Sequence, residues 1–258
     1  EFKQFFPENA VNYFVSYYDY YQPEAYIASS NTYIEKDLQI NEEIEKLRLR
    51  TTSALMSGRR DIIVVSSISC IYGMGNPEDF SNSIFRFAVG TKISRNAFLH
   101  RLVEILYART TVDFRRGTFR VKGDTVDIYP AYMDFAYRVS FFVDDIEELS
   151  TIDPASGKTL EKMDHLAIFP ANLFVTPKER LTQSIWAIQE ELENRKQQFI
   201  DEKRFLEAKR LEERVNYDLE MIRELGYCSG IENYSRFFDG RTPGMRPFCL
   251  LDYFRMII

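Results

Sequence analysis

YYDYYQPEAY, residues 17–26, is the stretch around which the rest of the chain is organised. It places five tyrosines in ten residues and interrupts them with Asp19, Pro23 and Glu24. A core strand would not carry proline in its middle, and a core helix would need a partner for every buried phenol hydroxyl. We therefore predict that the rings meet a flat ligand such as a nucleobase, where stacking contributes about 1–3 kcal/mol per base. A structural hairpin packed on its own domain is the alternative.

Two β-prone runs flank a polar turn within and after this stretch. Ala25–Ala28 leads into the turn signal Ser29–Asn31, and Thr32–Lys36 resumes β-prone residues. Strand, turn and strand together predict a long β-hairpin over residues 17–40. Its exposed apolar residues, Tyr33 among them, favour an edge that slides against a ligand.

The composition is that of a globular chain of 258 residues with 45% hydrophobic residues and a formal net charge of -6. No apolar run approaches the ~20 residues of a membrane span, and there is no secretory leader. The negative charge argues against nucleic-acid binding by bulk attraction, so stacking and a few local cations must carry any DNA contact. The three cysteines are far apart, which argues against a zinc site or disulfide framework and fits a reducing cytoplasm.

A helix and a buried strand are expected after the hairpin. Asn41 is a plausible N-cap, and the acidic residues that follow it favour the positive end of a helix. The β-branched run Asp61–Cys70 is typical of a strand buried on both faces of a parallel sheet. The arginines between them form a local basic cluster, for which a solvated helix face is the alternative. That cluster consists of Arg48, Arg50, Arg59 and Arg60.

The stretch from about residue 80 to 175 predicts a helix over Arg95–Leu106 and then a small antiparallel sheet. Thr118–Lys122 and Thr125–Tyr129 alternate around Gly123-Asp124, which is a two-residue hairpin signal. Phe119, Val121, Val126 and Ile128 are expected to face one side of this sheet, and Arg120 and Lys122 the other.

Cations are expected to line the second face, with Arg109, Arg115, Arg116 and Arg138 nearby in the sequence. Such a row is suited to docking an acidic protein surface, and ordinary solvated strand residues are the alternative.

Ser156-Gly157-Lys158-Thr159 looks like the end of a phosphate-binding loop. The full pattern requires a glycine where Ile152 stands, and Asp153-Pro154 indicates a turn. We therefore reject a nucleotide site here.

Two helices are predicted between Pro177 and Gly226, with their joint at Phe199–Asp201 and Gly226 as the C-cap. Residues 230–236 are expected to form a loop, and Leu250–Phe254 indicates the approach to another strand. The apolar stripes are Leu181, Ile185, Ile188 and Leu192 in the first helix, and Leu206, Leu211, Val215, Leu219 and Ile222 in the second.

Besides the tyrosine stretch, five motifs follow one another along the chain: IEKD (34–37), SCIYG (69–73), RGTFRV (116–121), GYCSGIENYSR (226–236) and LLDYF (250–254). In this order they resemble the UvrB family, the damage-verifying subunits of bacterial nucleotide excision repair. The resemblance covers essentially the whole chain except its last four residues.

The resemblance implies an α/β fold with an α+β insert: part of a RecA-like helicase domain carrying a β-hairpin, a small antiparallel β insert domain and a helical domain. The expected divisions are 1–16 as the edge of the RecA-like domain, 17–40 as the hairpin, 41–80 as helix and buried strand of the helicase core, 81–175 as the UvrA-binding insert, 176–226 as the helical domain, and 227–258 as the return to the RecA-like domain.

The resemblance also implies two binding surfaces. The DNA-binding residues would be Tyr17, Tyr18, Tyr20, Tyr21, Glu24, Tyr26, Tyr33 and Arg48. The UvrA-binding residues would be Arg109, Arg120, Lys122 and Arg138, with lysine at 122 where the family more often has arginine. Lysine keeps the charge but loses the bidentate fork.

Partners implied by the resemblance are UvrA, damaged or single-stranded DNA and UvrC, in the cytoplasm and within the SOS response, with no membrane. The family's phosphate-binding loop would precede Glu1, and its Mg²⁺ motif would follow Phe254, where Arg255–Ile258 departs from the pattern. We therefore expect an internal segment of an excision nuclease subunit that does not hydrolyse ATP alone, with ATP and Mg²⁺ as cofactors of the full-length parent. A protein-binding scaffold or adaptor with a purely structural hairpin is the alternative.

Overall fold

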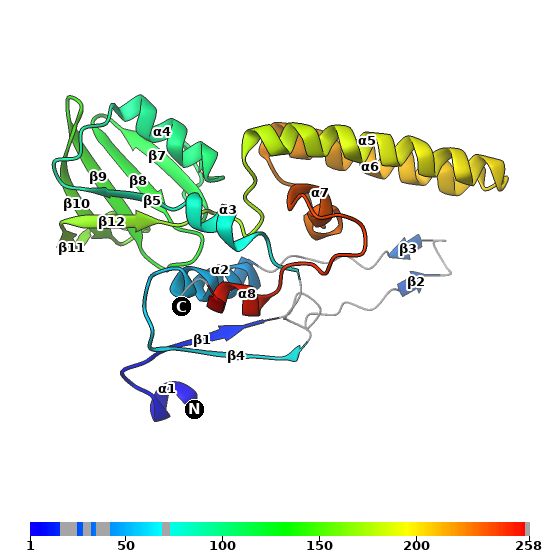
Figure 1. Cartoon of the computed structure of the whole chain (residues 1–258). Coiled ribbons are helices and arrows are strands. Elements are labelled where there is room, and N and C mark those ends of the chain that lie inside the picture. Colours follow the sequence, from blue (N-terminus) through cyan, green and yellow to red (C-terminus); the bar gives the residue numbers. More distant parts are fainter. Residues whose placement is uncertain (16–24, 28–31, 35–41, 69–72, 256–258) are drawn as a thin grey trace.

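The computed structural model describes residues 1–15, 25–27, 32–34, 42–68 and 73–255. Figure 1 shows a small parallel β pair with its helices, a β-rich region beside it, and a long pair of helices.

The parallel pair consists of β1 (Ala10–Phe14) and β4 (Ile62–Ser66), in register from Ala10 opposite Ile62 to Phe14 opposite Ser66. Helix α2 (Glu42–Leu55) packs on β1, and the short helix α1 (Phe2–Phe5) precedes β1 in the sequence. The parallel strand predicted from its β-branched run is confirmed. Its burial on both faces is not, because residues 62–65 are half-buried and β1 is its one partner strand among the described residues.

A β-hairpin lies where the sequence predicts it. Strands β2 (Ala25–Ile27) and β3 (Thr32–Ile34) are antiparallel, and Tyr26 is opposite Tyr33. The rest of the predicted arm lies outside the described residues.

The β-rich region contains a six-stranded sheet in the order β11-β10-β9-β8-β7-β6. Neighbours are antiparallel except for β6 and β7, which are parallel. The strands are β6 (Ala108–Arg109), β7 (Thr118–Lys122), β8 (Thr125–Tyr129), β9 (Ala136–Phe142), β10 (Asp145–Ile152) and β11 (Thr159–Met163).

One face of this sheet is covered by α4 (Arg95–Glu104) and by the antiparallel pair of β5 (Phe85–Ala88) and β12 (His165–Ile168). Apolar and polar residues alternate along β7 and β8, and every second side chain of a strand points to the same face of the sheet. The apolar side chains therefore gather on the covered face. Phe119, Val126 and Ile128 are buried there, in one apolar cluster with Phe98 of α4. The predicted hairpin is confirmed, and Gly123 supplies the positive φ of +58° that its turn needs.

The turn between β10 and β11 holds the sequence that looks like a phosphate-binding loop. The Ser156 backbone N–H and hydroxyl both donate to the Asp153 carboxylate at 2.7 Å. The Asp153 N–H donates to the Lys158 carbonyl at 2.9 Å. These bonds close a tight turn between antiparallel strands, in agreement with the rejection of a nucleotide site.

Helices α5 (Lys178–Asp201) and α6 (Phe205–Leu225) run alongside each other in Figure 1. Their joint falls at residues 202–204, slightly after the predicted position. Ile188 and Leu219 are buried as predicted, but Leu206 is 59% exposed because it lies in the first turn of α6, beside the joint. Gly226 is the C-cap of α6 with a φ of +73°, as predicted.

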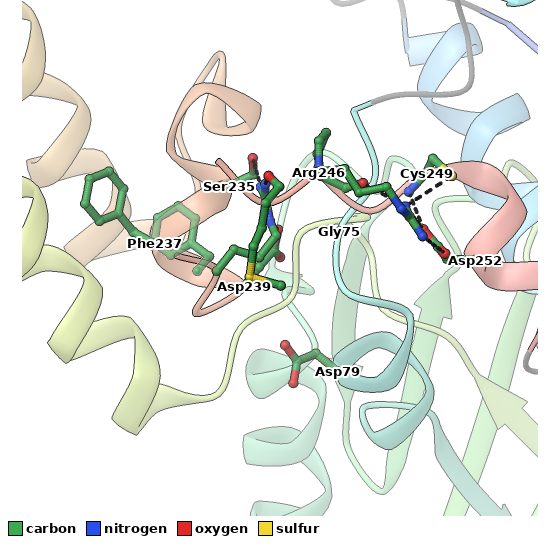
Figure 2. A network of polar contacts seen from close by, with 12 residues as sticks. Gly75, Asp79, Ser235, Phe237, Asp239, Arg246, Cys249 and Asp252 are labelled. Atoms are coloured by element: carbon green, nitrogen blue, oxygen red, sulfur yellow. Dashed lines mark hydrogen bonds and ion pairs between the residues drawn. The ribbon is translucent and has the colours of Figure 1, made fainter. Parts of the chain in front are cut away.

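The last segment differs from expectation. The predicted loop at 230–236 contains η3 (Ile231–Tyr234) and α7 (Ser235–Phe238), and the predicted strand approach is helix α8 (Leu250–Arg255). Figure 2 shows why α8 forms: Arg246 and Cys249 converge on Asp252. The Asp252 carboxylate accepts the Cys249 backbone N–H at 2.9 Å, so it satisfies a donor that the start of a helix leaves unpaired.

The helical pair is fastened to the rest of the chain by polar contacts at its base. The Ser184 hydroxyl donates to the Phe237 carbonyl at 2.9 Å. Arg180 donates to the buried Asp79 of α3 (Pro77–Asn82). These contacts place α3, α5 and α7 in one unit.

Polar contacts join the loops of the six-stranded sheet to the segment after β12 and to α2. The Phe169 carbonyl accepts the Tyr107 hydroxyl at 3.1 Å, and the Phe169 N–H donates to the Tyr132 hydroxyl at 3.2 Å. Asp134 accepts Lys46 Nζ of α2 at 3.0 Å and also pairs with Arg116. The Lys46 and Arg116 partners hold the pKa of Asp134 below its usual value of 3.8.

We predict that Asp134→Asn destabilises the chain at pH 7 by up to about 1 kcal/mol, because the carboxylate is largely exposed. A folded-state pKa below 3.8 means that the ion pairs contribute fully above that pH and lose their contribution as the pH falls further. Urea unfolding at pH 7 and pH 3 should therefore show a smaller difference from the wild type at pH 3. Asp124→Asn, at an 83% exposed side chain, is the control. An equal loss at both pH values contradicts the assignment.

Candidate functional site

The tyrosine hairpin is described only in part. Tyr17, Tyr18, Tyr20, Tyr21 and Glu24 lie outside the described residues, so their role as a DNA-binding surface stays a prediction. The backbone of β2 and β3 places Tyr26 and Tyr33 directly opposite each other.

Arg48 lies in the interior, where it contacts the two chain segments next to it. Its side chain is buried, and the residue is 1% exposed. Nη1 donates to the Val15 carbonyl at 3.0 Å and Nη2 to the Gly73 carbonyl at 2.9 Å. The guanidinium also lies 4.3 Å from the centre of the Phe14 ring. Carbonyl dipoles and an aromatic face compensate the buried charge.

This position separates Arg48 from the other arginines of the local basic cluster predicted from the sequence. Arg50, Arg59 and Arg60 are exposed, whereas Arg48 is enclosed by the end of β1 and by the segment that follows residue 72. The guanidinium therefore holds protein carbonyls, and a direct contact with DNA has no support in this geometry.

We predict that Arg48→Met lowers the free energy of unfolding by about 2–4 kcal/mol, because two buried carbonyls lose a charged donor. Arg50→Met, at an exposed position of the same helix, should change it by less than about 0.5 kcal/mol. Urea unfolding followed by circular dichroism measures both. Equal effects of the two variants would show that Arg48 is not a structural tie.

A cluster of charges spans the centre of the six-stranded sheet, on the face opposite its apolar core. Arg120 of β7, Asp127 of β8 and Arg138 of β9 are directly opposite one another across the three strands. Asp127 is 1% exposed. Its Oδ1 accepts Arg138 Nε at 2.6 Å, and its Oδ2 accepts Arg138 Nη2 at 2.9 Å and Arg120 Nε at 3.0 Å.

The two arginines are held differently. Arg138 also donates Nη1 to the Gly157 carbonyl at 3.2 Å, and its hydrogen bonds to Asp127 raise the pKa of Arg138. Arg120 lies 4.1 Å from the centre of the Phe114 ring and uses Nε alone for Asp127. In the part of the chain that the structure describes, Nη1 and Nη2 of Arg120 have no hydrogen-bond partner.

Lys122 lies two residues after Arg120 on β7 and is exposed, so alternation places it on the same face. Arg109 is exposed on the edge strand β6, in register with Phe119 and not with Arg120. The structure thus brings Arg120, Lys122 and Arg138 together, with Arg109 at the edge of the sheet.

Comparison with known proteins identifies the family. Residues 85–174 match the family model of the UvrB interaction domain, and residues 179–240 match that of the UvrB third helical domain. The chain is 63% identical over 254 residues to UvrABC system protein B of Cytophaga hutchinsonii. The chain belongs to the UvrB family. It is similar to the proteins of the same name from Bacteroides fragilis, at 60% identity, and Leptospira biflexa, at 55% identity.

Each of these alignments covers 98% of this chain and 38% of the relative. The chain therefore spans well under half the length of the UvrB proteins that it matches. The match to the interaction domain contains the whole Arg120–Asp127–Arg138 cluster.

Sequence reasoning missed two residues of this face. Asp127 could have been found from the hairpin, since a two-residue turn at 123–124 fixes Arg120 opposite Asp127. Phe142 is 66% exposed and follows Arg138 at an interval of four on β9, so it lies on the same face. A large exposed ring beside cations is the composition of a protein-binding surface.

Other kinds of site have no support in the described part of the chain. No group of three His, Cys, Asp or Glu residues there is placed to hold a metal ion. No helix among those residues is long and apolar enough to cross a membrane. Burial raises the pKa of Cys228 to about 12, so this thiol is protonated at neutral pH and is a poor nucleophile.

Proposed function

We propose that this chain is the part of a UvrB subunit that docks UvrA and holds a DNA strand during nucleotide excision repair. The observation that carries the proposal is the Arg120–Asp127–Arg138 cluster, on the face opposite the apolar core of the sheet that matches the UvrB interaction domain. UvrC is the further partner expected in the assembled system, and ATP with Mg²⁺ are its expected cofactors.

UvrA docking is supported by the chemistry of this face. Arg120 and Lys122 supply positive charge, and Phe142 supplies an exposed apolar ring on the same face. Charge complementarity directs a partner to a surface, whereas buried aromatic anchors supply much of the binding energy. The partner surface that fits is an acidic patch next to an apolar pocket.

DNA binding is supported by the position of the hairpin and by its tyrosines. Strands β2 and β3 form the antiparallel pair that such an arm requires. Tyr17, Tyr18, Tyr20 and Tyr21 precede β2 in the sequence, and Tyr26 and Tyr33 lie in the two strands. With a net charge of -6, the chain has little bulk attraction for phosphates. Stacking of tyrosine rings on bases does not require a positive net charge, so it can bind a DNA strand in such a chain.

We predict that Arg120→Glu lowers the affinity for UvrA at least tenfold, or about 1.4 kcal/mol. The change reverses a charge on the docking face and places a second carboxylate beside Asp127. Calorimetric titration with purified UvrA measures it, with single-stranded DNA binding expected to be unchanged. Arg86→Glu, an equal charge change at an exposed position of β5, is the control. UvrA affinity equal to that of the wild type would remove Arg120 from the docking face.

We predict that the double variant Tyr17→Ala/Tyr18→Ala weakens single-stranded DNA binding by roughly tenfold or more, since each stacked base contributes about 1–3 kcal/mol. Fluorescence anisotropy with a labelled oligonucleotide measures the loss, and circular dichroism checks that the fold is retained. Tyr13→Ala, at a 53% exposed tyrosine of β1, is the control. If the double variant binds DNA like the parent, the chain is better explained as a protein-binding adaptor with a structural hairpin.

A further inference from the structure

We propose that Asp127 is a positioning residue that holds the Arg120 guanidinium in the orientation in which it binds a carboxylate of the docking partner. The inference rests on the proposed function, because it specifies how the UvrA-docking face presents its charge. It assigns Asp127 a role in recognition although its carboxylate is 1% exposed and cannot touch a partner itself.

The burial of Asp127 requires it to be paired. A carboxylate removed from water is unfavourable unless charged donors satisfy it. Both of its oxygens accept guanidinium hydrogens, from Arg138 on one side and Arg120 on the other. The three residues stand on neighbouring strands in register, so the sheet fixes their spacing.

Asp127 binds Arg120 through Nε alone, so the edge of the guanidinium formed by Nη1 and Nη2 is left for a partner. The Asp127 carboxylate accepts a hydrogen bond from Arg120 Nε at 3.0 Å. The centre of the Phe114 ring lies 4.1 Å from Cζ of the guanidinium. Nη1 and Nη2 have no hydrogen-bond partner in the described part of the chain. These two nitrogens form the planar fork that matches a carboxylate with two parallel hydrogen bonds.

Arg138 holds the Asp127 carboxylate in place and is itself bound to a neighbouring turn. Its Nε and Nη2 bind Asp127, and its Nη1 binds the Gly157 carbonyl in the turn between β10 and β11. All three nitrogens are therefore engaged within the chain. Arg138 fixes the carboxylate, the carboxylate fixes Arg120, and Arg120 is the member that remains free to bind a partner.

Charge and geometry give opposite expectations for one substitution. Asp127→Asn removes a negative charge from the docking face, so simple attraction of an acidic partner would strengthen binding. If Asp127 instead positions Arg120, the same substitution weakens binding, because Arg120 must then be ordered when the complex forms. The loss should appear in the dissociation rate, since long-range charge acts mainly on association.

The experiment measures association and dissociation rates of the full chain with purified UvrA. We expect Asp127→Asn to raise the dissociation rate roughly fivefold without slowing association. Glu148→Gln is the matched control, because it removes an equal charge from the same face without touching either arginine. Its dissociation rate should equal that of the wild type.

A double-mutant cycle tests whether Asp127 acts through Arg120. Arg120→Lys keeps the charge but loses the planar fork, so it should also raise the dissociation rate. Adding Asp127→Asn to Arg120→Lys should then have no further effect. If Asp127→Asn does not fold, Arg138→Lys replaces it in the cycle, since it keeps the net charge and removes the two-point brace on Asp127.

The outcomes separate this inference from the proposed function. If Arg120→Glu leaves UvrA binding unchanged, the docking face itself is wrong. If Arg120→Glu weakens binding but Asp127→Asn or Arg138→Lys leaves the dissociation rate unchanged, the positioning role alone is overturned. Additive effects in the cycle would also overturn it, because Asp127 would then act independently of Arg120.

Discussion

A buried charge must be met by charged or strongly polar partners, and two such charges organise the functional parts of this chain. Asp127 is enclosed between two guanidinium groups at the centre of the sheet. Arg48 is enclosed between two backbone carbonyls, that of Val15 after β1 and that of Gly73 after β4. Removing a single partner would leave the other uncompensated, which is far more costly than exchanging a surface charge. Each cluster therefore fixes the geometry around it: the orientation of Arg120 in one case, and the spacing of Val15 and Gly73 in the other.

Helix α2 connects the surroundings of Arg48 to the β-rich region that contains Asp127. Lys46 of that helix binds Asp134, which also binds Arg116 at the edge of the β-rich region. Arg48 follows two residues later and holds the carbonyl of Val15, shortly before the predicted hairpin arm. The Tyr107 and Tyr132 hydroxyls hold the peptide of Phe169 between them, and Tyr132 and Phe169 belong to the same apolar cluster as Leu49 and Leu55 of α2. A protein docked on the sheet and a strand held by the hairpin would thus be carried on one continuous framework.

The sequence predicts the elements whose pattern is local. Alternation around Gly123-Asp124 is enough for β7 and β8, because the turn type sets the register and the register sets the faces. Prediction from local pattern fails at Leu250–Phe254, because a short apolar run is compatible with a strand or a helix equally well. At this segment the helix is favoured by Asp252, whose carboxylate accepts the backbone N–H of Cys249, the residue before α8, and pairs with Arg246. The burial of Arg48 was also beyond reach, because its partners lie 33 and 25 residues away in the sequence.

The same distinction explains why the cations of the docking face were predicted but their organisation was not. A row of arginines and lysines is visible in the sequence, yet alternation alone describes them as equivalent. The structure makes them unequal: Lys122 and Arg109 are exposed, and Arg138 donates Nε, Nη1 and Nη2 within the chain. Arg120 donates only Nε to a partner in the described part of the chain. In a chain with a net charge of -6, recognition of an acidic partner cannot depend on total charge. If this face docks UvrA as proposed, recognition would depend on where a few donors are held, and Asp127 would be the group that holds them although it lowers the charge of the face.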